Sequence, residues 1–382
     1  MPLEHNRTVE LSAAPALETG GLLTIDLGAV AANWRELARL SAPAECGAVV
    51  KADGYGLGLK PIARALRNAG CHTFFVAQLA EARVLRAQDS ASVIYVFNGL
   101  TPGTCPTYAE CDLRPCLGSI AEINEWTAFR AASGWHGSAA LHVDTGMNRL
   151  GMSLREAAAL ADSREQARVG ADLLMSHFAI SEDPTHRLNA RQMGLFRELR
   201  DVFPGLRGSL ANSSGIFLGP DAQHDLVRPG VALYGANPTP GHVNPMRPVV
   251  RLDGRVVQVR SVAQGETVGY GAAWTARRPS RVAIVSAGYA DGFLRSAGAS
   301  DPRREGAEAN IAGKRCLVAG RISMDLLAVD VTDCDDGLPR RGDMAALIDD
   351  DIGIDEFADR AGTIAYEALT SLGARYARIY RE

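Results

Sequence analysis

Short apolar runs alternate with amphipathic helical stretches from about residue 45 to about residue 238 of this 382-residue chain. The runs that read as strands are GAVVK, TFFVAQ, SVIYVFNG, LRPCLG, AALHVDTG, ADLLMSH, GSLANSS and VRPGVALYG. Strands that alternate with helices form right-handed βαβ units, and eight such units in roughly 200 residues fit a closed (β/α)8 barrel. A doubly wound sheet would use fewer strands, so the pattern predicts an α/β fold with a TIM-like barrel.

The sequence pattern changes after about residue 248. Strand-like runs such as RVAIVSAGY and DMAALIDD are then separated by turn residues, which predicts a mostly β domain over residues 249–382. We assign residues 22–248 to the barrel domain, with LLTIDL as a leading strand outside the series of eight, and residues 1–21 to an N-terminal tail.

Composition excludes several classes of function. The formal net charge is -4 and the chain has no basic stripe, so we expect no nucleic-acid partner. It has neither a signal-peptide core nor a long uncharged run, which predicts a cytoplasmic protein without a membrane segment. The 7 Cys are odd in number and form no CxxC pair, which indicates reduced packing residues and no metal site. The acidic run Asp349–Asp351 lacks a full calcium-ligand series and predicts a solvated turn.

Polar side chains follow the predicted barrel strands at their carboxyl ends, where barrel enzymes carry their chemistry. In VVKADGYGLG, Lys51 ends the first strand and three glycines follow, which allow positive φ or close approach to a ligand. A lysine inside such a site is a candidate for a Schiff base with a carbonyl cofactor such as pyridoxal phosphate, and the alternative is a surface lysine. Ser213, Ser214 and the Gly230 turn follow strands seven and eight, where barrels often hold phosphate.

The order of motifs resembles the alanine racemase family, whose members use pyridoxal 5'-phosphate and combine a barrel with a β domain. The matching stretches run from about Leu22 to Tyr380 and are AVVKADGYGLG, VDTGMNRLG, MSHFA, ANSSG, VRPGVALYG, VGYGAAWTA, GYADGFLRS, GRISMD and YEALTSLGARYARIY. The resemblance implies a homodimer in which Tyr270 and Met324 reach the site of the partner subunit. It implies no nucleic-acid or membrane partner.

The resemblance also implies a role for each matched residue. Lys51 would hold the cofactor as an aldimine, Arg228 would face its pyridine nitrogen, and His177 would lie between Arg228 and Tyr270. The remaining cofactor-binding residues would be Tyr55, Asn212, Ser213, Gly230, Val231 and Tyr366. Arg149 and Met324 would bind the substrate carboxylate, and Tyr289, Arg295 and Arg321 would line the substrate entrance.

These residue types suit the interconversion of L-alanine and D-alanine. Racemisation removes the α-proton from one face and returns a proton to the other, which two bases on opposite faces can do. Lys51 would serve one face and Tyr270 the other, if a nearby positive charge favours its phenolate. Arg228 cannot donate a full proton to the pyridine nitrogen, which favours racemisation over transamination.

Other features bear on substrate and role. Tyrosines at the entrance favour alanine and admit serine as a slow substrate. Where many family members carry a carbamylated lysine that braces the carboxylate-binding arginine, this chain has His142, so the brace differs: Asp144, a water or an anion. A broader-specificity racemase and a pyridoxal-phosphate carrier remain alternatives. The expected product, D-alanine, is a peptidoglycan precursor, and the enzyme can supply or consume it.

Overall fold

The computed structural model describes residues 16–163, 165–301 and 305–382. Its described residues divide into two compact units, one within residues 30–247 and one that combines residues 16–29 with those of 248–382. Most of the predicted N-terminal tail, residues 1–15, lies outside the described residues.

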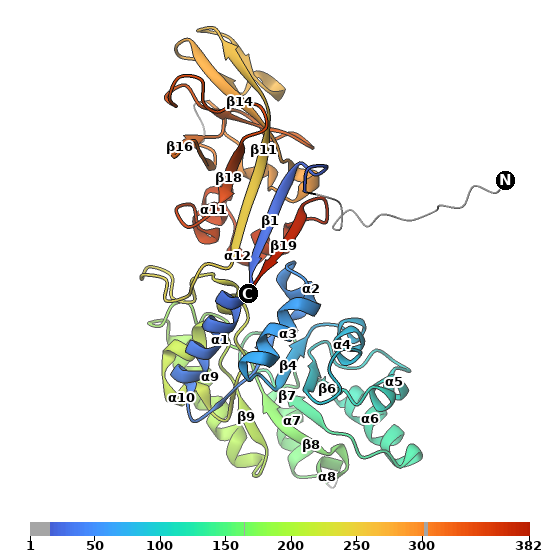
Figure 1. Cartoon of the computed structure of the whole chain (residues 1–382). Coiled ribbons are helices and arrows are strands. Elements are labelled where there is room, and N and C mark those ends of the chain that lie inside the picture. Colours follow the sequence, from blue (N-terminus) through green and yellow to red (C-terminus); the bar gives the residue numbers. More distant parts are fainter. Residues whose placement is uncertain (1–15, 164, 302–304) are drawn as a thin grey trace, which may run out of the picture. The chain divides into compact units, whose positions relative to one another are not determined.

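The first unit contains parallel strands wrapped by helices (Figure 1). One sheet has the order β3-β4-β5-β6-β7-β8-β9. Its strands are β3 (Ala48–Val49), β4 (Thr73–Val76), β5 (Val93–Val96), β6 (Arg114–Leu117), β7 (Ala139–His142), β8 (Ala171–Met175) and β9 (Arg207–Ser209). Phe74, Phe75, Ile94 and Leu141 are fully buried, which explains the continuous apolar runs of these strands.

Two short strands close this sheet into a barrel. β10 (Leu226–Val227) pairs in parallel with β2 (Glu45–Cys46), which continues into β3 after Gly47. β10 also contacts the segment after β9, because the backbone nitrogen of Arg228, directly after β10, donates to the carbonyl of Ala211. The predicted eight-stranded barrel is therefore confirmed.

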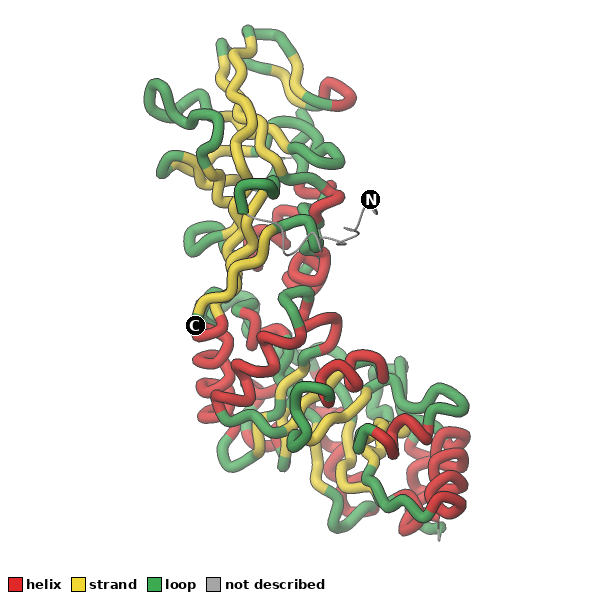
Figure 2. Tube along the Cα trace, turned by 45° about the vertical axis from the view of Figure 1, so that its right-hand side comes forward, coloured by secondary structure: helices red, strands yellow, loops and turns green. Residues whose placement is uncertain are grey.

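Helices connect the strands and cover their outer side (Figure 2). They are α1 (Leu27–Ser41), α2 (Lys51–Tyr55), α3 (Leu59–Ala69), α4 (Leu79–Arg86), α5 (Cys105–Glu110), α6 (Ile120–Ser133), α7 (Leu154–Ala161), α8 (Glu165–Val169), α9 (Arg187–Val202) and α10 (Pro220–Gln223), with the 3-10 turns η2 (Ser214–Leu218) and η3 (Val231–Tyr234). Several begin at an N-cap, as at Ser153, whose hydroxyl oxygen accepts from the Glu156 nitrogen at 3.2 Å.

The second unit is mostly β, as predicted. Its eight-stranded sheet has the order β16-β15-β18-β11-β1-β19, with β14 beside β11 and β17 beside β14. The strands are β1 (Gly21–Asp26), β11 (Val250–Val262), β14 (Ser280–Ser286), β15 (Glu308–Ile311), β16 (Lys314–Leu317), β17 (Leu327–Asp330), β18 (Met344–Ile348) and β19 (Ala377–Arg381), with a separate pair β12 (Thr267–Val268) and β13 (Trp274–Thr275). The short helices are η4 (Tyr270–Ala272), η5 (Tyr289–Asp291), η6 (Arg295–Ala297), α11 (Ile354–Ala361) and α12 (Ala365–Ser371).

The leading strand lies in this second unit, so assigning it to the barrel domain of residues 22–248 was wrong. β1 pairs antiparallel with β11 and parallel with β19. Both edges of its backbone are thereby satisfied, and Leu23 and Ile25 are fully buried in this sheet.

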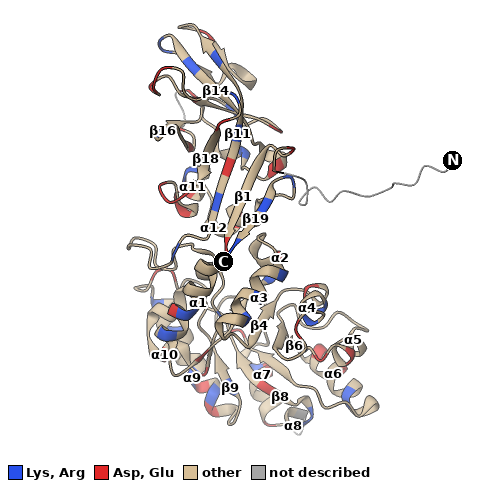
Figure 3. Ribbon diagram, in the orientation of Figure 1, with Lys and Arg blue, Asp and Glu red and all other residues tan. Residues whose placement is uncertain are grey.

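Charged residues of both signs are interspersed along the elements of both units (Figure 3). Within the described residues, we find no helix that is long and apolar enough to cross a membrane.

Candidate active site

Lys51 stands at the start of a left-handed turn. α2 has positive backbone angles at Ala52 (φ 53°, ψ 50°), Asp53 (φ 54°, ψ 48°) and Gly54 (φ 63°, ψ 45°). Positive φ was predicted for the glycines, but it begins two residues before the first of them. Residues with a Cβ adopt this conformation only at a cost in free energy. Hydrogen bonds hold the turn, including one from the Leu59 nitrogen to Asp53 Oδ1 at 2.7 Å.

The surroundings of Lys51 favour its neutral amine. Burial lowers the pKa of Lys51, and the positive charge of Arg149 lowers it further, while the carboxylate of Glu81 acts in the opposite direction. A neutral amine is the form that attacks a carbonyl or removes a proton.

Arg228 is the buried cation of the barrel interior. Its guanidinium donates to the carbonyl oxygens of Ser176 at 2.5 Å and Leu210 at 3.4 Å, and to the Ser209 hydroxyl. Its Nε has no hydrogen-bond partner although it is buried. Burial lowers the pKa of Arg228 to about 10, so the side chain stays cationic at neutral pH.

Two histidines lie close to this cation. Burial, followed by the charge of Arg228, lowers the pKa of His177 well below its ordinary value, and Arg149 and Lys51 add to the effect. Burial and the charge of Arg228 also lower the pKa of His142, to about 4. Both imidazoles are therefore neutral at pH 7. Arg228 donates to the carbonyl of Ser176, the residue before His177, and the nitrogen of Val49 donates to the carbonyl of Pro229 at 2.9 Å. These bonds bring the strand ends that carry Lys51, His177 and Arg228 together.

The turn before Arg149 is organised by Asp144. Its carboxylate accepts hydrogen bonds from the backbone nitrogens of Gly146 and Met147 at 2.8 Å and of Asn148 at 2.9 Å. Asp144 therefore shapes the backbone that carries Arg149, whose side chain is exposed.

A small cradle forms where the loops after β9 and β10 meet. Ser213 Oγ accepts from the backbone nitrogens of Gly230 at 2.9 Å and Ala232 at 3.3 Å. A Cβ at Gly230 would lie 2.3 Å from the hydroxyl oxygen of Tyr55, so a larger residue there would displace this hydroxyl. The Tyr55 ring stacks on Tyr234, with centroids 4.5 Å apart.

The other predicted residues of this loop region lie nearby. Asn212 Oδ1 accepts from the Gly215 nitrogen and the Ser181 hydroxyl, both at 2.8 Å. Val231 begins η3 and is buried. The barrel unit thus gathers its predicted cofactor residues at the carboxyl ends of its strands.

In the second unit, the predicted residues gather around residues 320–324. A Cβ at Gly271, directly after Tyr270, would lie 2.9 Å from Nη1 of Arg321, so the guanidinium packs against the Tyr270 turn. The backbone nitrogen of Tyr289 donates to the carbonyl of Ser323 at 3.1 Å, which places Tyr289 beside Met324.

Two further predicted residues lie in neighbouring elements of this unit. Arg295 begins η6, and the nitrogen of Ala299, shortly after η6, donates to the Gly320 carbonyl at 2.9 Å. Tyr366 lies in α12 and is partly exposed. The described residues of one chain therefore carry the predicted site in two separate groups, one in each unit.

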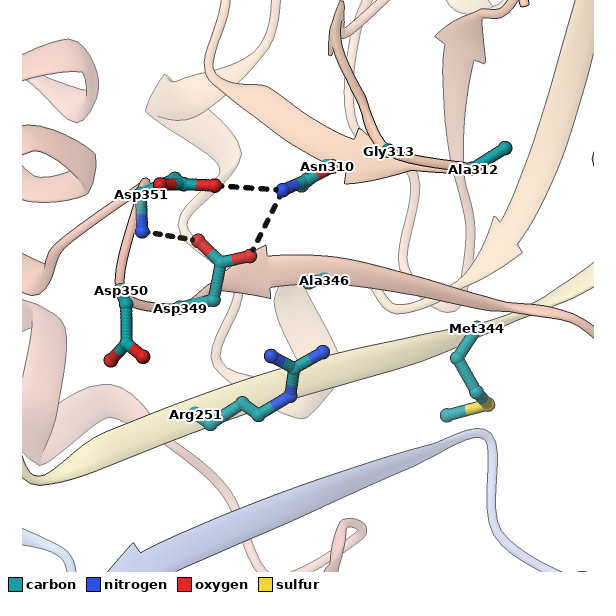
Figure 4. A pocket seen from close by; sticks show the side chains of 9 residues that line it. All are labelled: Arg251, Asn310, Ala312, Gly313, Met344, Ala346, Asp349, Asp350 and Asp351. Carbon is teal, nitrogen blue, oxygen red and sulfur yellow. Dashed lines mark hydrogen bonds between the residues drawn. The ribbon is translucent and has the colours of Figure 1, made fainter. Parts of the chain in front are cut away.

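A hollow of about 400 Å³ in the second unit has polar walls (Figure 4). Asp349 Oδ1 accepts from the nitrogens of Asp351 and Ile352, and Asn310 donates to the carboxylates of Asp349 and Asp351. Asp349 is buried, so the predicted solvated turn is wrong for this residue. The hollow contains none of the predicted site residues.

Both parts of the chain match known family models. Residues 25–238 match the alanine racemase N-terminal domain, and residues 249–380 match the alanine racemase C-terminal domain. The chain belongs to the alanine racemase family. A relative named alanine racemase from Methylobacterium sp. (strain 4-46) is 54% identical over 94% of this chain and 98% of its own length.

Solved structures agree with this membership. The chain is similar to the crystal structure of alanine racemase from Bartonella henselae with covalently bound pyridoxal phosphate, with a TM-score of 0.89, 39% identity and coverage of 95% and 99% of the two chains. It is also similar to the biosynthetic alanine racemase from Pseudomonas aeruginosa, with a TM-score of 0.87, 33% identity and coverage of 95% and 100%.

Sequence reasoning missed two residues that contact the predicted site residues or their turn. Glu81 faces the Lys51 turn, and its only signal was its position as the third residue of a helix, after the possible cap Gln78. Tyr234, which stacks on Tyr55 and donates to the Val49 carbonyl at 3.0 Å, had no signal beyond its motif.

Proposed function

We propose that this protein interconverts L-alanine and D-alanine with pyridoxal 5'-phosphate bound at the mouth of the barrel. The observation that carries the proposal is the buried guanidinium of Arg228, whose Nε has no hydrogen-bond partner, at strand ends that also carry Lys51 and His177. The cradle of Ser213 and Gly230 supports it from the adjoining loops.

The residues present fit this cofactor. Arg228 Nε is a buried donor without a partner, which a ring nitrogen would satisfy. The Ser213 hydroxyl, whose oxygen accepts from the Gly230 nitrogen, and the backbone nitrogen of Val231 offer the donors that a phosphate needs, with Tyr55 and Tyr366 as further phosphate contacts. Lys51 would hold the aldehyde carbon. When bound, the cofactor supplies an electron-withdrawing ring conjugated to the substrate nitrogen, which acidifies the α-proton.

Lys51 and Tyr270 would act as the two bases. The depressed pKa of Lys51 supports its role, because a neutral amine can accept the α-proton. Arg321 packs against Gly271, the residue that follows Tyr270 in the chain. Each base would serve one face of the substrate.

Arg228 favours racemisation over transamination. Its guanidinium remains protonated and donates a hydrogen bond without transferring its proton. The lowered pKa of His177 keeps its imidazole neutral, so it does not supply an acidic proton to Arg228 or to the cofactor ring.

The substrate would be held by its carboxylate. Arg149 and Met324 would bind this group. The narrow entrance would be formed by Tyr270 and Tyr366 together with Tyr289, Arg295 and Arg321, and it would select a substrate with a methyl side chain.

Exposure supports a homodimer with a shared site. Tyr270 is 70% exposed and Met324 53% exposed, and Ile364 near Tyr366 is 62% exposed. Aromatic and apolar side chains this open are typical of a surface that another subunit covers. We propose that Tyr270 and Met324 of each chain complete the site of the other.

The protein would act in the cytoplasm. Relatives at 44% and 45% identity are named biosynthetic and catabolic alanine racemases. Because two enantiomers have equal free energies, the same reaction can supply D-alanine for peptidoglycan precursors or consume it.

A panel of single L-amino acids in deuterated water tests the proposal. The purified protein with pyridoxal phosphate should form α-deuterated D-alanine fast and little product from lysine, arginine or glutamate. Main turnover of larger amino acids would indicate a broader-specificity racemase. Absence of exchange with every amino acid would indicate a pyridoxal-phosphate carrier.

A further inference from the structure

Glu81 connects the turn of Lys51 to a neighbouring helix. It is the third residue of α4, and its Oε2 accepts from the backbone nitrogens of Ala77 at 2.9 Å and Gln78 at 3.0 Å. Its Oε1 accepts from the backbone nitrogen of Ala52 at 2.6 Å, 29 residues earlier in the chain. One carboxylate therefore binds the β4–α4 connection and the residue that directly follows Lys51.

The turn at Ala52 needs such an anchor. Left-handed backbone costs about 1–2 kcal/mol for each residue with a Cβ, and Ala52 and Asp53 both adopt it. Such conformations persist where surrounding contacts determine them and are found at functional sites. Asp53 holds the far end of the turn through Leu59, so Glu81 is the anchor at the end that carries Lys51.

We propose that Glu81 is a positioning residue that fixes the backbone of Lys51 for its bond to the cofactor and for proton transfer. This inference rests on the proposed function. A charge-assisted hydrogen bond holds the Ala52 nitrogen and thereby the direction in which the Lys51 side chain leaves the strand. Without it, the turn relaxes toward right-handed or extended backbone and the amine moves away from its working position.

The competing explanation is that Glu81 only caps α4. Glu122 offers a matched comparison, because it is the third residue of α6 and has the same pattern of contacts. Its Oε2 accepts from the Gly118 nitrogen at 3.0 Å and the Ser119 hydroxyl at 2.9 Å, and its Oε1 accepts from the Leu100 nitrogen at 2.9 Å. It thus bridges a helix start to the preceding strand–helix loop, but that loop holds no candidate site residue.

The test compares Glu81→Gln with Glu122→Gln in the full-length protein loaded with pyridoxal phosphate. An amide has a single acceptor oxygen, so each variant loses one side of its bridge. We would measure the thermal midpoint, the rate of cofactor release by absorbance, the fraction of cofactor trapped on Lys51 by borohydride and located by peptide mass spectrometry, and kcat and KM for alanine.

Both variants should lose similar stability. Only Glu81→Gln should release the cofactor faster, by about tenfold or more, as expected for the loss of one hydrogen bond to a charged group. It should also trap less cofactor on Lys51 and lower kcat more than it changes KM. Equal release rates and equal kcat values in the two variants would overturn the proposal and leave Glu81 as a helix cap.

A second variant covers the case in which Glu81→Gln does not fold. Glu81→Asp keeps a carboxylate in the first turn of α4 but is one methylene too short to hold Ala52 as well. It should also release the cofactor faster, and release at the wild-type rate would overturn the proposal. Failure of the wild-type protein to trap cofactor on Lys51 would instead contradict the proposed function.

Discussion

The hydroxyl oxygen of Ser213 accepts a hydrogen bond from the backbone nitrogen of Gly230 at 2.9 Å. This contact joins the loop after β9 to the loop after β10 across 17 positions of the sequence. Because the oxygen of Ser213 accepts this bond, its hydroxyl hydrogen is left to donate to the proposed phosphate.

Replacing Ser213 with alanine should weaken cofactor binding. The variant loses one donor to a charged phosphate, so the Kd for pyridoxal phosphate should rise by about tenfold to a hundredfold. A spectroscopic titration of apoprotein would measure it. The neighbouring substitution Ser214→Ala is the control and should change the Kd by much less; equal effects of the two would contradict the phosphate role of Ser213.

Replacing Arg228 with lysine should destabilise the barrel. The planar guanidinium serves Ser176, Ser209 and Leu210 at once, which an ammonium group cannot do. The free energy of unfolding should fall by about 3 kcal/mol, as expected when hydrogen bonds to a buried charged group are lost. Urea denaturation at fixed cofactor concentration would measure it, and the exposed Arg64→Lys should be neutral. A loss as small in Arg228→Lys as in Arg64→Lys would contradict this account.

The sequence was most informative where one local pattern had one structural solution. Alternating strand and helix periods predicted the barrel, because buried parallel strands have few other arrangements. It was less informative for β1, whose apolar run suits any sheet and whose partners β11 and β19 lie more than 200 residues away. The left-handed Ala52 and its anchor Glu81 were missed because neither residue type signals that conformation; tertiary contacts impose it.

Stability should depend on pH through His142. In the folded chain its pKa is lowered from 6.5 to about 4, so the unfolded chain takes up a proton as pH falls through 6.5 while the folded chain stays neutral. The free energy of unfolding is therefore complete above pH 6.5 and falls by up to about 3 kcal/mol as pH drops toward 4.

The variant His142→Gln should make this dependence shallower. Urea denaturation at several pH values between 4.5 and 7 would measure the slope. His177 shifts in the same direction, so part of the slope should remain. The exposed His136→Gln is the control and should keep the wild-type slope, and an unchanged slope in His142→Gln would show that another group titrates.

Replacing Tyr270 with phenylalanine should affect the two enantiomers unequally. The phenol is the proposed base on one face, and its removal should leave the bond between Lys51 and the cofactor intact, because that bond is formed by the Lys51 amine alone. Proton abstraction from one enantiomer should fall by a factor of about 100 or more, and abstraction from the other by less, as for the loss of a general base. Wash-in of deuterium into L-alanine and D-alanine, each supplied alone, would separate the two steps.

The substitution Tyr380→Phe, on β19 of the same unit, should leave both rates unchanged. Equal losses for both enantiomers in Tyr270→Phe would exclude Tyr270 as a face-specific base, whereas an intact absorbance of the bound cofactor with one slow direction would support the two-base assignment.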